Sequence, residues 1–496
     1  MCGIAGILGP PDKALMTRML AMMRHRGPDD IGIMVDDSVA LGHDRLSIID
    51  VKKGHQPISN EDGSKFIVVN GEIYNFHALR AGLKGHTLRT DSDSEVALHM
   101  YEEYGPESTK MFDGMFAMAI YDGDGLFIAR DPLGIKPLYY GVADGSFYFA
   151  SELKAILEAV DVVHEFPPGF QCYIPNGSNK LTPKEFASID THLSKPSRFD
   201  AAAKAVFKGL SDAVNKRLIS DVPLGAFLSG GIDSTIVTSL AARQVPGMNT
   251  FATGMEGAPD LDMARMAADQ FGVDHHELVF TEEDVINHIE WVIYHLESFD
   301  AALVRSAIPT YFVSNLARRY VKVVLTGEGA DELFAGYQYV KSINYPDIHD
   351  ELVRTVKSLH NINLQRCDRM TMAHAIEGRV PFLDHAFVNY ALPLPTEFKL
   401  RKHDMQEKHI IREAFRSVLP KLTVGRKKRK FAEGTGSYEI VSKIAESAIS
   451  DKEFEREKVK TPVKVKTKEE LYCYRIFNEF FDNASAASVV GRTLTY

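Results

Sequence analysis

A cysteine beside the start of the chain offers the first candidate chemistry. Cys2 follows Met1 in "MCGIAGI", so loss of the initiator methionine would give Cys2 a free α-amino group as well as its thiol. The reference pKa values are about 8.5 for a thiol and about 7.7–8.0 for an α-amine, so the amine can take the thiol proton. One residue would then supply both a nucleophile and its base. The alternative is a small buried residue at the start of a strand.

Such a nucleophile needs hydrogen-bond donors for the developing oxyanion and groups that hold the substrate. In "VVNGEIYN", Asn70 offers a side-chain amide and Gly71 allows close backbone approach. Arg45 could bind a carboxylate, and Glu72 and Asp93 could bind an ammonium group. A carboxylate and an ammonium group together describe a free amino acid. Taken singly, Asn70-Gly71 could be an ordinary turn, and Arg45 and Asp93 could be surface charges.

A second candidate site lies in "FLSGGIDST", where a strand, a glycine turn and a helix follow one another. Backbone N–H groups of such a turn can bind a phosphate, and Ser229, Ser234 and Thr235 add hydroxyl donors. The chain has no GxxxxGK[ST] motif, and "TGEGADE" has Glu332 where a GxGxxG motif needs its third glycine. The alternative is a tight turn that binds no ligand.

Three acidic residues lie in or next to glycine turns of this region. Asp233 lies inside the first turn, and Asp331 lies in the second, "LTGEGADELFAGY", so the two carboxylates could share Mg²⁺ with phosphate oxygens. Glu328 stands among glycines at the end of a predicted strand, which is where ligands bind in a parallel sheet. Complementation of a helix N-terminus is the alternative role for each aspartate.

The elements around these motifs predict two domains. Residues 1–190 contain hairpins, of which one turns at "DGDG" (122–125), together with helical segments, so an α+β domain is expected. The polar stretch "ASIDTHLSKPSRFDAAA" is expected to be a linker. In residues 200–480 strands alternate with helices, which predicts an α/β domain with a parallel sheet and a helical C-terminal part. Residues 481–496 are expected to form a mobile tail.

Composition disfavours several classes of protein. The net charge of -10 argues against a general nucleic-acid binder, and no apolar run approaches the roughly 20 residues of a membrane helix. The first residues lack the pattern of a signal peptide. The four cysteines, which are Cys2, Cys172, Cys367 and Cys473, show no CxxC spacing, so neither a disulfide framework nor a zinc site is indicated. We expect a cytoplasmic protein.

Eight motifs of the first 170 residues resemble, in sequence and in order, the glutaminase domain of class II glutamine amidotransferases. They are "MCGIAGI", "RHRGPDD", "GHDRLSIID", "VVNGEIYN", "TDSDSEV", "DGMFAMAIYD", "ARDPLGIKPLYY" and "FASELKAI". The resemblance implies an Ntn-hydrolase-type αββα sandwich. It also implies that an amino-terminal cysteine attacks the side-chain amide of glutamine and releases ammonia.

This resemblance implies a role for each candidate. Cys2 would be the nucleophile, and the Asn70 side chain and the Gly71 amide would form the oxyanion hole. Glu72 and Asp93 would lie around the amino group of glutamine. Arg45 would bind the glutamine carboxylate. The segment that lines the pocket, mostly through its backbone, would be Arg45, Leu46, Ser47, Ile48 and Ile49.

A second set of motifs resembles the synthetase domain of asparagine synthetases, a branch of the pyrophosphate-loop ATPases. The set is "SGGIDS", "LTGEGADELFAGY", "VIYHLESFD", "RMTMAHAIEGRVPFLD" and "GRKKRKFAEG", and it runs from about residue 200 to 435. The resemblance implies that ATP is cleaved to AMP and pyrophosphate as the side-chain carboxylate of aspartate is adenylated. Ammonia then displaces AMP and gives asparagine.

The same resemblance assigns residues to these steps. Glu328 would serve the adenylation, and Asp233 and Asp331 would carry Mg²⁺. Arg305 and Lys428 would neutralise phosphate charge in the transition state. The other residues expected around ATP and pyrophosphate, besides Asp233, are Leu228, Ser229, Gly230, Gly231, Ser234, Thr253, Thr326 and Gly327.

Together the motifs predict a two-domain enzyme that uses glutamine, aspartate and ATP and binds neither nucleic acid nor a membrane. A homodimer is a further expectation. One alternative is a relative that amidates another carboxylate, such as a sugar acid or a peptide. Another is an inactive regulatory or binding homologue. β-Lactam-forming relatives are disfavoured because they lack the amino-terminal cysteine. Thr326, Ala330 and Gly425 depart from the commoner family pattern.

Overall fold

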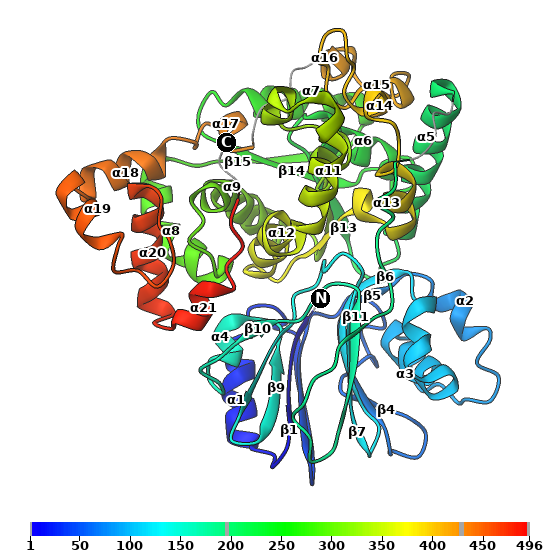
Figure 1. Ribbon diagram of the computed structural model, residues 1–496. Helices are drawn as coiled ribbons and strands as arrows, with labels where there is room; N and C mark the ends of the chain where they lie inside the picture. Colours follow the sequence, from blue (N-terminus) through cyan, green and yellow to red (C-terminus); the bar gives the residue numbers. More distant parts are fainter. Residues whose placement is uncertain (1, 194–197, 426–430, 494–496) are drawn as a thin grey trace.

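The computed structural model shows two domains stacked on one another (Figure 1). It describes residues 2–193, 198–425 and 431–493. The first domain, blue to cyan in Figure 1, lies below the second. Among the described residues, no helix has the length and apolar character to cross a bilayer.

Two antiparallel sheets form the first domain. One has the strand order β10-β8-β9-β1-β3-β2 and the other the order β12-β11-β7-β6-β5-β4. The strands of the first sheet are β1 (Cys2–Leu8), β2 (Asp30–Asp36), β3 (Val39–Arg45), β8 (Tyr139–Ala143), β9 (Ser146–Ala150) and β10 (His164–Glu165). Those of the second are β4 (Ile58–Ser59), β5 (Phe66–Ile73), β6 (Gly114–Tyr121), β7 (Gly125–Arg130), β11 (Phe170–Pro175) and β12 (Lys184–Glu185).

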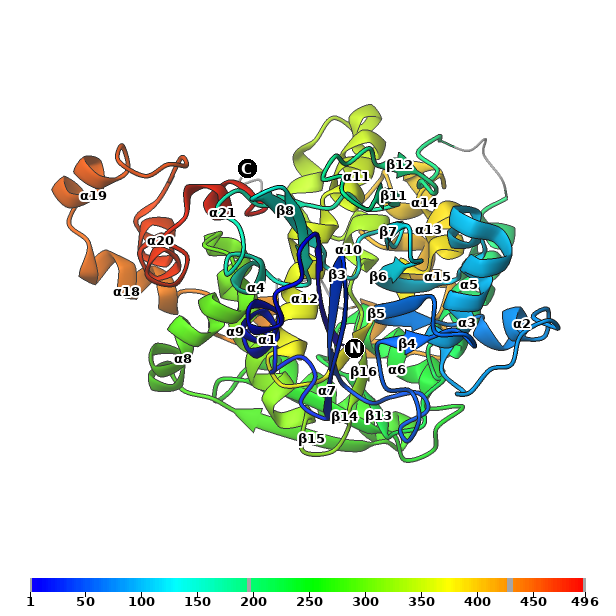
Figure 2. The same ribbon diagram turned by 90° about the horizontal axis from the view of Figure 1, so that it is seen from below.

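The two sheets pack face to face, and helices cover their outer faces (Figure 2). These helices are α1 (Lys13–Ala21) and α4 (Leu153–Ile156) on one side, and α2 (Phe76–Arg80) and α3 (Asp93–Tyr104) on the other. Apolar side chains of both sheets form the core between them. The αββα sandwich predicted from the sequence is therefore confirmed.

The central strand β1 is buried on both faces, which explains its unbroken apolar sequence. Ile4 and Leu8 belong to the core between the sheets, whereas Ala5 and Ile7 belong to the core under α1. Burial on two faces removes the polar alternation of a half-exposed strand. The strand pairs with β3 and β9. Cys2 is thus held at the end of a central strand.

A five-stranded parallel sheet organises the second domain, in the order β15-β14-β13-β16-β17. Its strands are β13 (Leu224–Phe227), β14 (Asn249–Gly254), β15 (Asp274–Val279), β16 (Val323–Leu325) and β17 (Glu377–Arg379). Helices α5 (Phe199–Lys216) and α6 (Ile232–Ala241) pack on one face, and α9 (Ala301–Ala317) packs on the other. Cover on both faces is typical of a parallel sheet, and the predicted α/β domain is confirmed.

The other helices surround this sheet and form the helical C-terminal part. Before the tail they are α7 (Pro259–Phe271), α8 (Glu282–Leu296), α10 (Ala330–Leu333), α11 (Ile348–Lys357), α12 (Asn363–Met372), α13 (His385–Ala391), α14 (Thr396–Lys399) and α15 (His409–Ala414). The last six are α16 (Lys421–Gly425), α17 (Phe431–Gly434), α18 (Ile440–Ala448), α19 (Asp451–Glu457), α20 (Lys468–Phe480) and α21 (Ala484–Ser488).

The end of the chain differs from the expected mobile tail as far as residue 493. It forms α21, whose Ala486 and Ala487 are buried in the core that also contains α1. The Val163 backbone N–H donates to Ser485 Oγ at 3.0 Å, and Thr493 Oγ1 donates to Asp300 Oδ1 at 2.8 Å. The residues that were expected to form a mobile tail are therefore docked on both domains as far as residue 493.

Two candidate active sites joined by a buried interface

Cys2 lies opposite Arg45 in the pairing of β1 with β3. Its backbone N–H donates to Asn70 Oδ1 on β5 at 3.1 Å, so the cysteine is fixed to both sheets. The thiol is buried, and burial raises its pKa, while the Leu46 backbone N–H and the Arg45 guanidinium act in the opposite direction. A buried thiol of this kind needs a nearby base before it can attack.

Asn70 is oriented so that its amide nitrogen remains available. Oδ1 is occupied by Cys2, whereas the buried Nδ2 has no hydrogen-bond partner among the described residues. An unpaired buried N–H₂ group is costly unless a ligand satisfies it. At the neighbouring Gly71 a Cβ atom would lie 2.0 Å from Met115 O, so only glycine fits there. The arrangement suits stabilisation of an oxyanion.

Arg45 and the loop after it form one wall of this site. The guanidinium donates to Ile49 O at 3.2 Å, Asp50 O at 2.7 Å and Val51 O at 3.2 Å, which shapes residues 46–51 around it. Leu46 and Ile48 are buried against the second domain. The Ser47 backbone N–H donates to Asp29 Oδ2 at 2.7 Å. The predicted pocket segment is therefore ordered by its own arginine and by the domain contact.

Glu72 and Asp93 bring negative charge to the same buried region. Asp93 begins α3 and accepts a hydrogen bond from the Ile73 N–H at 2.8 Å. Burial, together with Glu377 and Asp93, raises the pKa of Glu72 well above its ordinary range, and burial also raises the pKa of Asp93. Such carboxylates would gain from an ammonium group placed between them.

The second domain contributes to the environment of this acidic pair, which sequence reasoning missed. Glu377 and Arg379 lie on β17, and Arg379 Nη2 lies 3.6 Å from Glu72 Oε1. Both residues stand in the motif "AIEGRVPFLD", which was assigned to the other site. Only the packing of β17 against the first domain brings them here.

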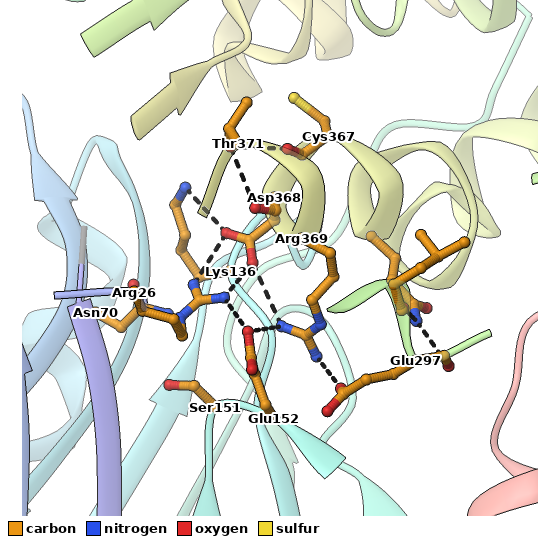
Figure 3. A network of polar contacts seen from close by, with 12 residues as sticks. Arg26, Asn70, Lys136, Ser151, Glu152, Glu297, Cys367, Asp368, Arg369 and Thr371 are labelled. Atoms are coloured by element: carbon orange, nitrogen blue, oxygen red, sulfur yellow. Dashed lines mark hydrogen bonds and ion pairs between the residues drawn. The ribbon is translucent and has the colours of Figure 1, made fainter. Parts of the chain in front are cut away.

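A network of buried charges joins the two domains next to Cys2 (Figure 3). Arg26 donates to Cys2 O at 2.9 Å, to Glu152 Oε1 at 2.7 Å and to Asp368 Oδ2 at 2.8 Å. Further ion pairs extend it across the interface through Lys136, Lys154, Glu297 and Arg369. Buried charges are tolerated when each is paired.

Helix α12 connects this network to the second site. Asp368 pairs with Arg26, which holds Cys2, while Arg366 on the same helix pairs with Glu328. Neither charge of α12 was singled out from the sequence. A rigid helix that contacts both sites gives them a shared structural support.

The glycine turn of the second site follows β13 as predicted. Gly230 has φ +66°, and a Cβ there would lie 2.4 Å from Met263 Cβ, so close packing and backbone conformation both require glycine. The Ser229 backbone N–H donates to Ser234 Oγ, and the two Oγ atoms are also 3.2 Å apart. The turn and the start of α6 therefore present hydroxyl and N–H groups together, which suits a phosphate group.

Asp233 and Asp331 meet at one lysine. Lys408 Nζ lies 2.5 Å from Asp233 Oδ2 and 2.6 Å from Asp331 Oδ1, and the lysine is fully buried. Sequence reasoning missed Lys408, which stands in no recognisable motif. Because both carboxylates reach a single ammonium, their oxygens converge on one cation position, and hard oxygen donors of this kind fit Mg²⁺.

Glu328 follows β16 and is also paired with a cation. Arg366 donates to its carboxylate, and the Glu328 backbone N–H donates to Thr326 Oγ1 at 3.3 Å. The neighbouring Glu332 accepts from Tyr337 and, at 2.8 Å, from Asn363 Nδ2. Burial and the Asp331 carboxylate raise the pKa of Glu332 to about 7. The turn thus concentrates acidic groups that internal donors compensate.

A cavity of about 570 Å³ opens over these groups. The predicted residues that line it are Ser229, Gly231, Asp233, Ser234, Arg305, Thr326, Gly327, Glu328 and Asp331. Leu228, Gly230 and Thr253 are not in its lining. Thr253 Oγ1 instead donates to Leu278 O at 2.8 Å, and Leu228 lies in a hydrophobic cluster. Lys428 falls outside the described residues.

Arg305 reaches the cavity from α9 but already has partners. It forms an ion pair with Glu469 on α20, and its guanidinium lies 4.7 Å from the centre of the Tyr438 ring. A phosphate group would have to compete with Glu469 for this arginine.

Each half of the chain matches a known protein family. Residues 1–190 match the glutamine amidotransferase domain. Residues 205–345 and 341–493 match the asparagine synthase family.

Curated relatives match almost the whole chain. Asparagine synthetase B [glutamine-hydrolyzing] from Escherichia coli (strain K12) is 37% identical over 99% of this chain and 93% of its own length. Asparagine synthetase [glutamine-hydrolyzing] 3 from Arabidopsis thaliana is 39% identical over 99% of this chain and 89% of its own length. The Sandersonia aurantiaca asparagine synthetase [glutamine-hydrolyzing] is 40% identical over 97% and 96%, respectively.

Proposed function

Because this chain belongs to the glutamine-hydrolysing asparagine synthetase family, we propose that its two sites act in series on one nitrogen atom. The enzyme is an ATP-dependent carbon–nitrogen ligase that makes asparagine with glutamine as the nitrogen donor. The first site releases ammonia from glutamine, and the second site activates aspartate and receives the ammonia. A relative that amidates a sugar acid or a peptide is not favoured, since the curated relatives named above are asparagine synthetases.

In the first step Cys2, freed of Met1, attacks the side-chain amide carbon of glutamine. Its α-amine takes the thiol proton and passes a proton to the leaving ammonia. The Asn70 Nδ2 group and the Gly71 N–H stabilise the oxyanion, and Arg45 binds the glutamine carboxylate. Glu72 and Asp93 bind its ammonium group. Water then hydrolyses the thioester and releases glutamate.

In the second step the carboxylate of aspartate attacks the α-phosphorus of ATP, and pyrophosphate leaves. The turn from Ser229 to Ser234 binds the pyrophosphate, and Arg305 neutralises charge on the phosphates. Asp233 and Asp331 would hold Mg²⁺, which supplies Lewis-acid neutralisation of the phosphate oxygens when bound. Lys408, which pairs with both aspartates, holds the two carboxylates close to each other. Glu328 serves the adenylation, and ammonia then displaces AMP.

One observation carries the serial arrangement most directly: helix α12 touches both sites. Asp368 contacts Arg26 behind Cys2, and Arg366 contacts Glu328. Ammonia transferred inside the protein stays uncharged and nucleophilic, whereas in neutral water most of it becomes ammonium. A buried interface between the sites supports such a transfer.

An acceptor screen tests the proposal. Pyrophosphate release would be measured with ATP, Mg²⁺, glutamine and a panel of carboxylates that includes aspartate, glutamate, sugar acids and short peptides. We expect aspartate alone to stimulate release, with one asparagine formed per pyrophosphate. Stimulation by another carboxylate in place of aspartate would contradict the proposal.

The buried free cysteines are compatible with the predicted cytoplasmic location. That location and the predicted homodimer stay predictions.

A further inference from the structure

Two histidines and two glutamates meet in the first domain, away from the glutamine site. They are Glu61 in the turn between β4 and β5, His86 in the loop after α2, and His99 and Glu102 on α3. One ligand atom from each lies within 4.8 Å of the others. The cluster contains no cysteine, and neither the family matches nor the proposed function gives it a role.

Four imidazole–carboxylate distances in this cluster lie near the spacing of neighbouring ligand atoms in a tetrahedral metal site, and all four ligand atoms are within 4.8 Å of one another. His86 Nδ1 lies 3.1 Å from Glu61 and 3.7 Å from Glu102. His99 Nδ1 lies 2.7 Å from Glu102 and 3.8 Å from Glu61. Metal–ligand bonds of about 2.0–2.1 Å in a tetrahedron place neighbouring ligand atoms about 3.3 Å apart, which is the middle of this range.

The outer contacts, a hydrogen bond for His86 and a longer charge contact for His99, also resemble those of metal-binding histidines, whose second nitrogen usually faces a carboxylate or carbonyl. His86 Nε2 lies 3.0 Å from Glu103 Oε1, and His99 Nε2 lies 3.9 Å from Glu95 Oε1. Each ring therefore directs Nδ1 to the centre and Nε2 to a carboxylate outside it. The second oxygen of Glu102 accepts from Asn60 Nδ2 at 2.8 Å, which fixes the carboxylate.

The charge balance favours a divalent cation. Four carboxylates, those of Glu61, Glu95, Glu102 and Glu103, surround two imidazoles. Even with both rings protonated, the six groups would keep two negative charges. The His99 side chain is only 1% exposed and that of Glu61 is 35% exposed, so the cluster is covered on one side and open to solvent on the other. An ion could enter past Glu61.

We propose that Glu61, His86, His99 and Glu102 form a structural binding site for a divalent transition metal ion, with Zn²⁺ as the best fit. Paired imidazole and carboxylate ligands suit Zn²⁺ better than Mg²⁺ or Ca²⁺, which prefer oxygen ligands alone. The ion joins three segments that are separate in sequence: the β4–β5 turn, the loop after α2, and α3. Because α3 begins at Asp93, the metal would brace the helix that carries this residue of the glutamine pocket.

The site is tested by metal content of the full-length protein. The chain is loaded with Zn²⁺, dialysed against excess Mg²⁺ to displace weakly held ions, and analysed by plasma mass spectrometry. A Cys2→Ala chain is treated in parallel, because the Cys2 thiol is itself a zinc ligand. We expect one Zn²⁺ per chain in both proteins. Zinc that disappears with Cys2→Ala would overturn the site.

Variants then locate the ion. His86→Gln should abolish stoichiometric zinc and the zinc-dependent rise in melting temperature. His192→Gln is the matched control, because that histidine is 95% exposed and pairs only with Asp190 among the described residues; it should retain zinc. Glu103→Gln, which alters only the outer partner of His86, should weaken zinc affinity by about 10- to 100-fold. Equal zinc in His86→Gln and wild type would refute the assignment.

Absorption spectroscopy of the unmutated protein tests the site without depending on whether a variant folds. Co²⁺ in place of Zn²⁺ should give the intense visible absorption of a tetrahedral site, and Zn²⁺ should abolish it. Absence of that spectrum, with no bound zinc, would mean that the histidines are simply paired with glutamates. Because metal content is read without glutamine, aspartate or ATP, failure here leaves the proposed function unaffected.

Discussion

The Cys2 site is built mainly on paired strands, whereas the Glu328 site is built on loops that follow strands. Cys2, Arg45 and Asn70 belong to β1, β3 and β5, and each is fixed by hydrogen bonds to the backbone or to a neighbouring residue. Around the cavity, Ser229 and Glu328 lie in glycine turns. Strand positions allow little movement, which suits covalent attack at a single atom. Turns present many N–H groups at once, which suits a large anion.

The two sites also differ in whether their polar and charged side chains have partners within the protein. Around Cys2 the Asn70 amide nitrogen and one Glu72 oxygen are buried without a hydrogen-bond partner in the described structure. Around the cavity Asp233 is paired with Lys408, Glu328 with Arg366, and Arg305 with Glu469. The proposed glutamine site therefore keeps unpaired polar atoms available to a substrate, whereas the proposed ATP site would exchange internal ion pairs for substrate contacts. Four predictions test this contrast.

The largest expected effect follows Cys2→Ala. Loss of the nucleophile should lower glutamine-dependent asparagine formation by at least about 10⁴-fold, since no other group replaces the thiol. Synthesis from ammonium should remain within about twofold, because the second site is untouched. Amino-acid analysis with glutamine or ammonium chloride as donor measures both. Cys172→Ala, also buried in the first domain, is the control and should leave both activities unchanged. Loss of both activities in Cys2→Ala would contradict a division into two sites.

Glu328→Gln should have the next largest effect. Aspartate-dependent pyrophosphate release should fall by about 10²- to 10⁴-fold, the range typical of a lost catalytic carboxylate. Glutamate release from glutamine should persist, because the Cys2 site keeps its own support. Exposed Glu397→Gln serves as the control for the change of charge. Adenylation that survives in Glu328→Gln would remove this residue from the mechanism.

Asp368→Asn tests the interface on which both sites depend. The change leaves the buried Arg26 and Lys136 without their shared anion, so the free energy of unfolding should fall by about 3–5 kcal/mol. Urea unfolding measures the loss. The control is Asp212→Asn in the Lys208–Asp212 pair, whose side chains are 79% and 52% exposed, where the cost should stay below about 1 kcal/mol. Equal costs in the two variants would show that the buried network adds no stability.

The smallest effect concerns the pH dependence of stability at Glu332. Its pKa is raised from 4.5 to about 7 in the folded protein, so the folded state holds an extra proton between these values. Stability contributed by that proton is lost as pH rises through this window. The glutamine of Glu332→Gln is neutral at every pH. The free energy of unfolding of this variant should therefore decline less steeply as pH rises, by up to about 1.4 kcal/mol per pH unit. Urea midpoints from pH 4.5 to 8 measure it, with Glu397→Gln as control. Parallel curves for wild type and Glu332→Gln would contradict the raised pKa.

The sequence by itself determined the local architecture and most of the candidate chemistry. Continuous apolar runs, "DGDG" and "SGGIDS" specify strands, a hairpin and a strand–turn–helix unit through short-range conformational preferences. The same preferences place Ser229 and Glu328 just after parallel strands and Asp233 in the first turn of the helix that follows, where a site was expected. Family motifs added the role of Cys2, which its chemistry alone left open.

Only the tertiary structure decided which charges face one another. Lys408 meets Asp233 across 175 positions of the chain, and Asp368 meets Arg26 across 342. No local sequence pattern encodes such pairs. The partner of a buried charge comes from the segment that packs against it, and that segment can lie anywhere in the chain. The same holds for Glu377 beside Glu72 and for His86 beside His99. The tail that looked mobile is also held by long-range contacts, since small residues gain stability only from the surface on which they dock.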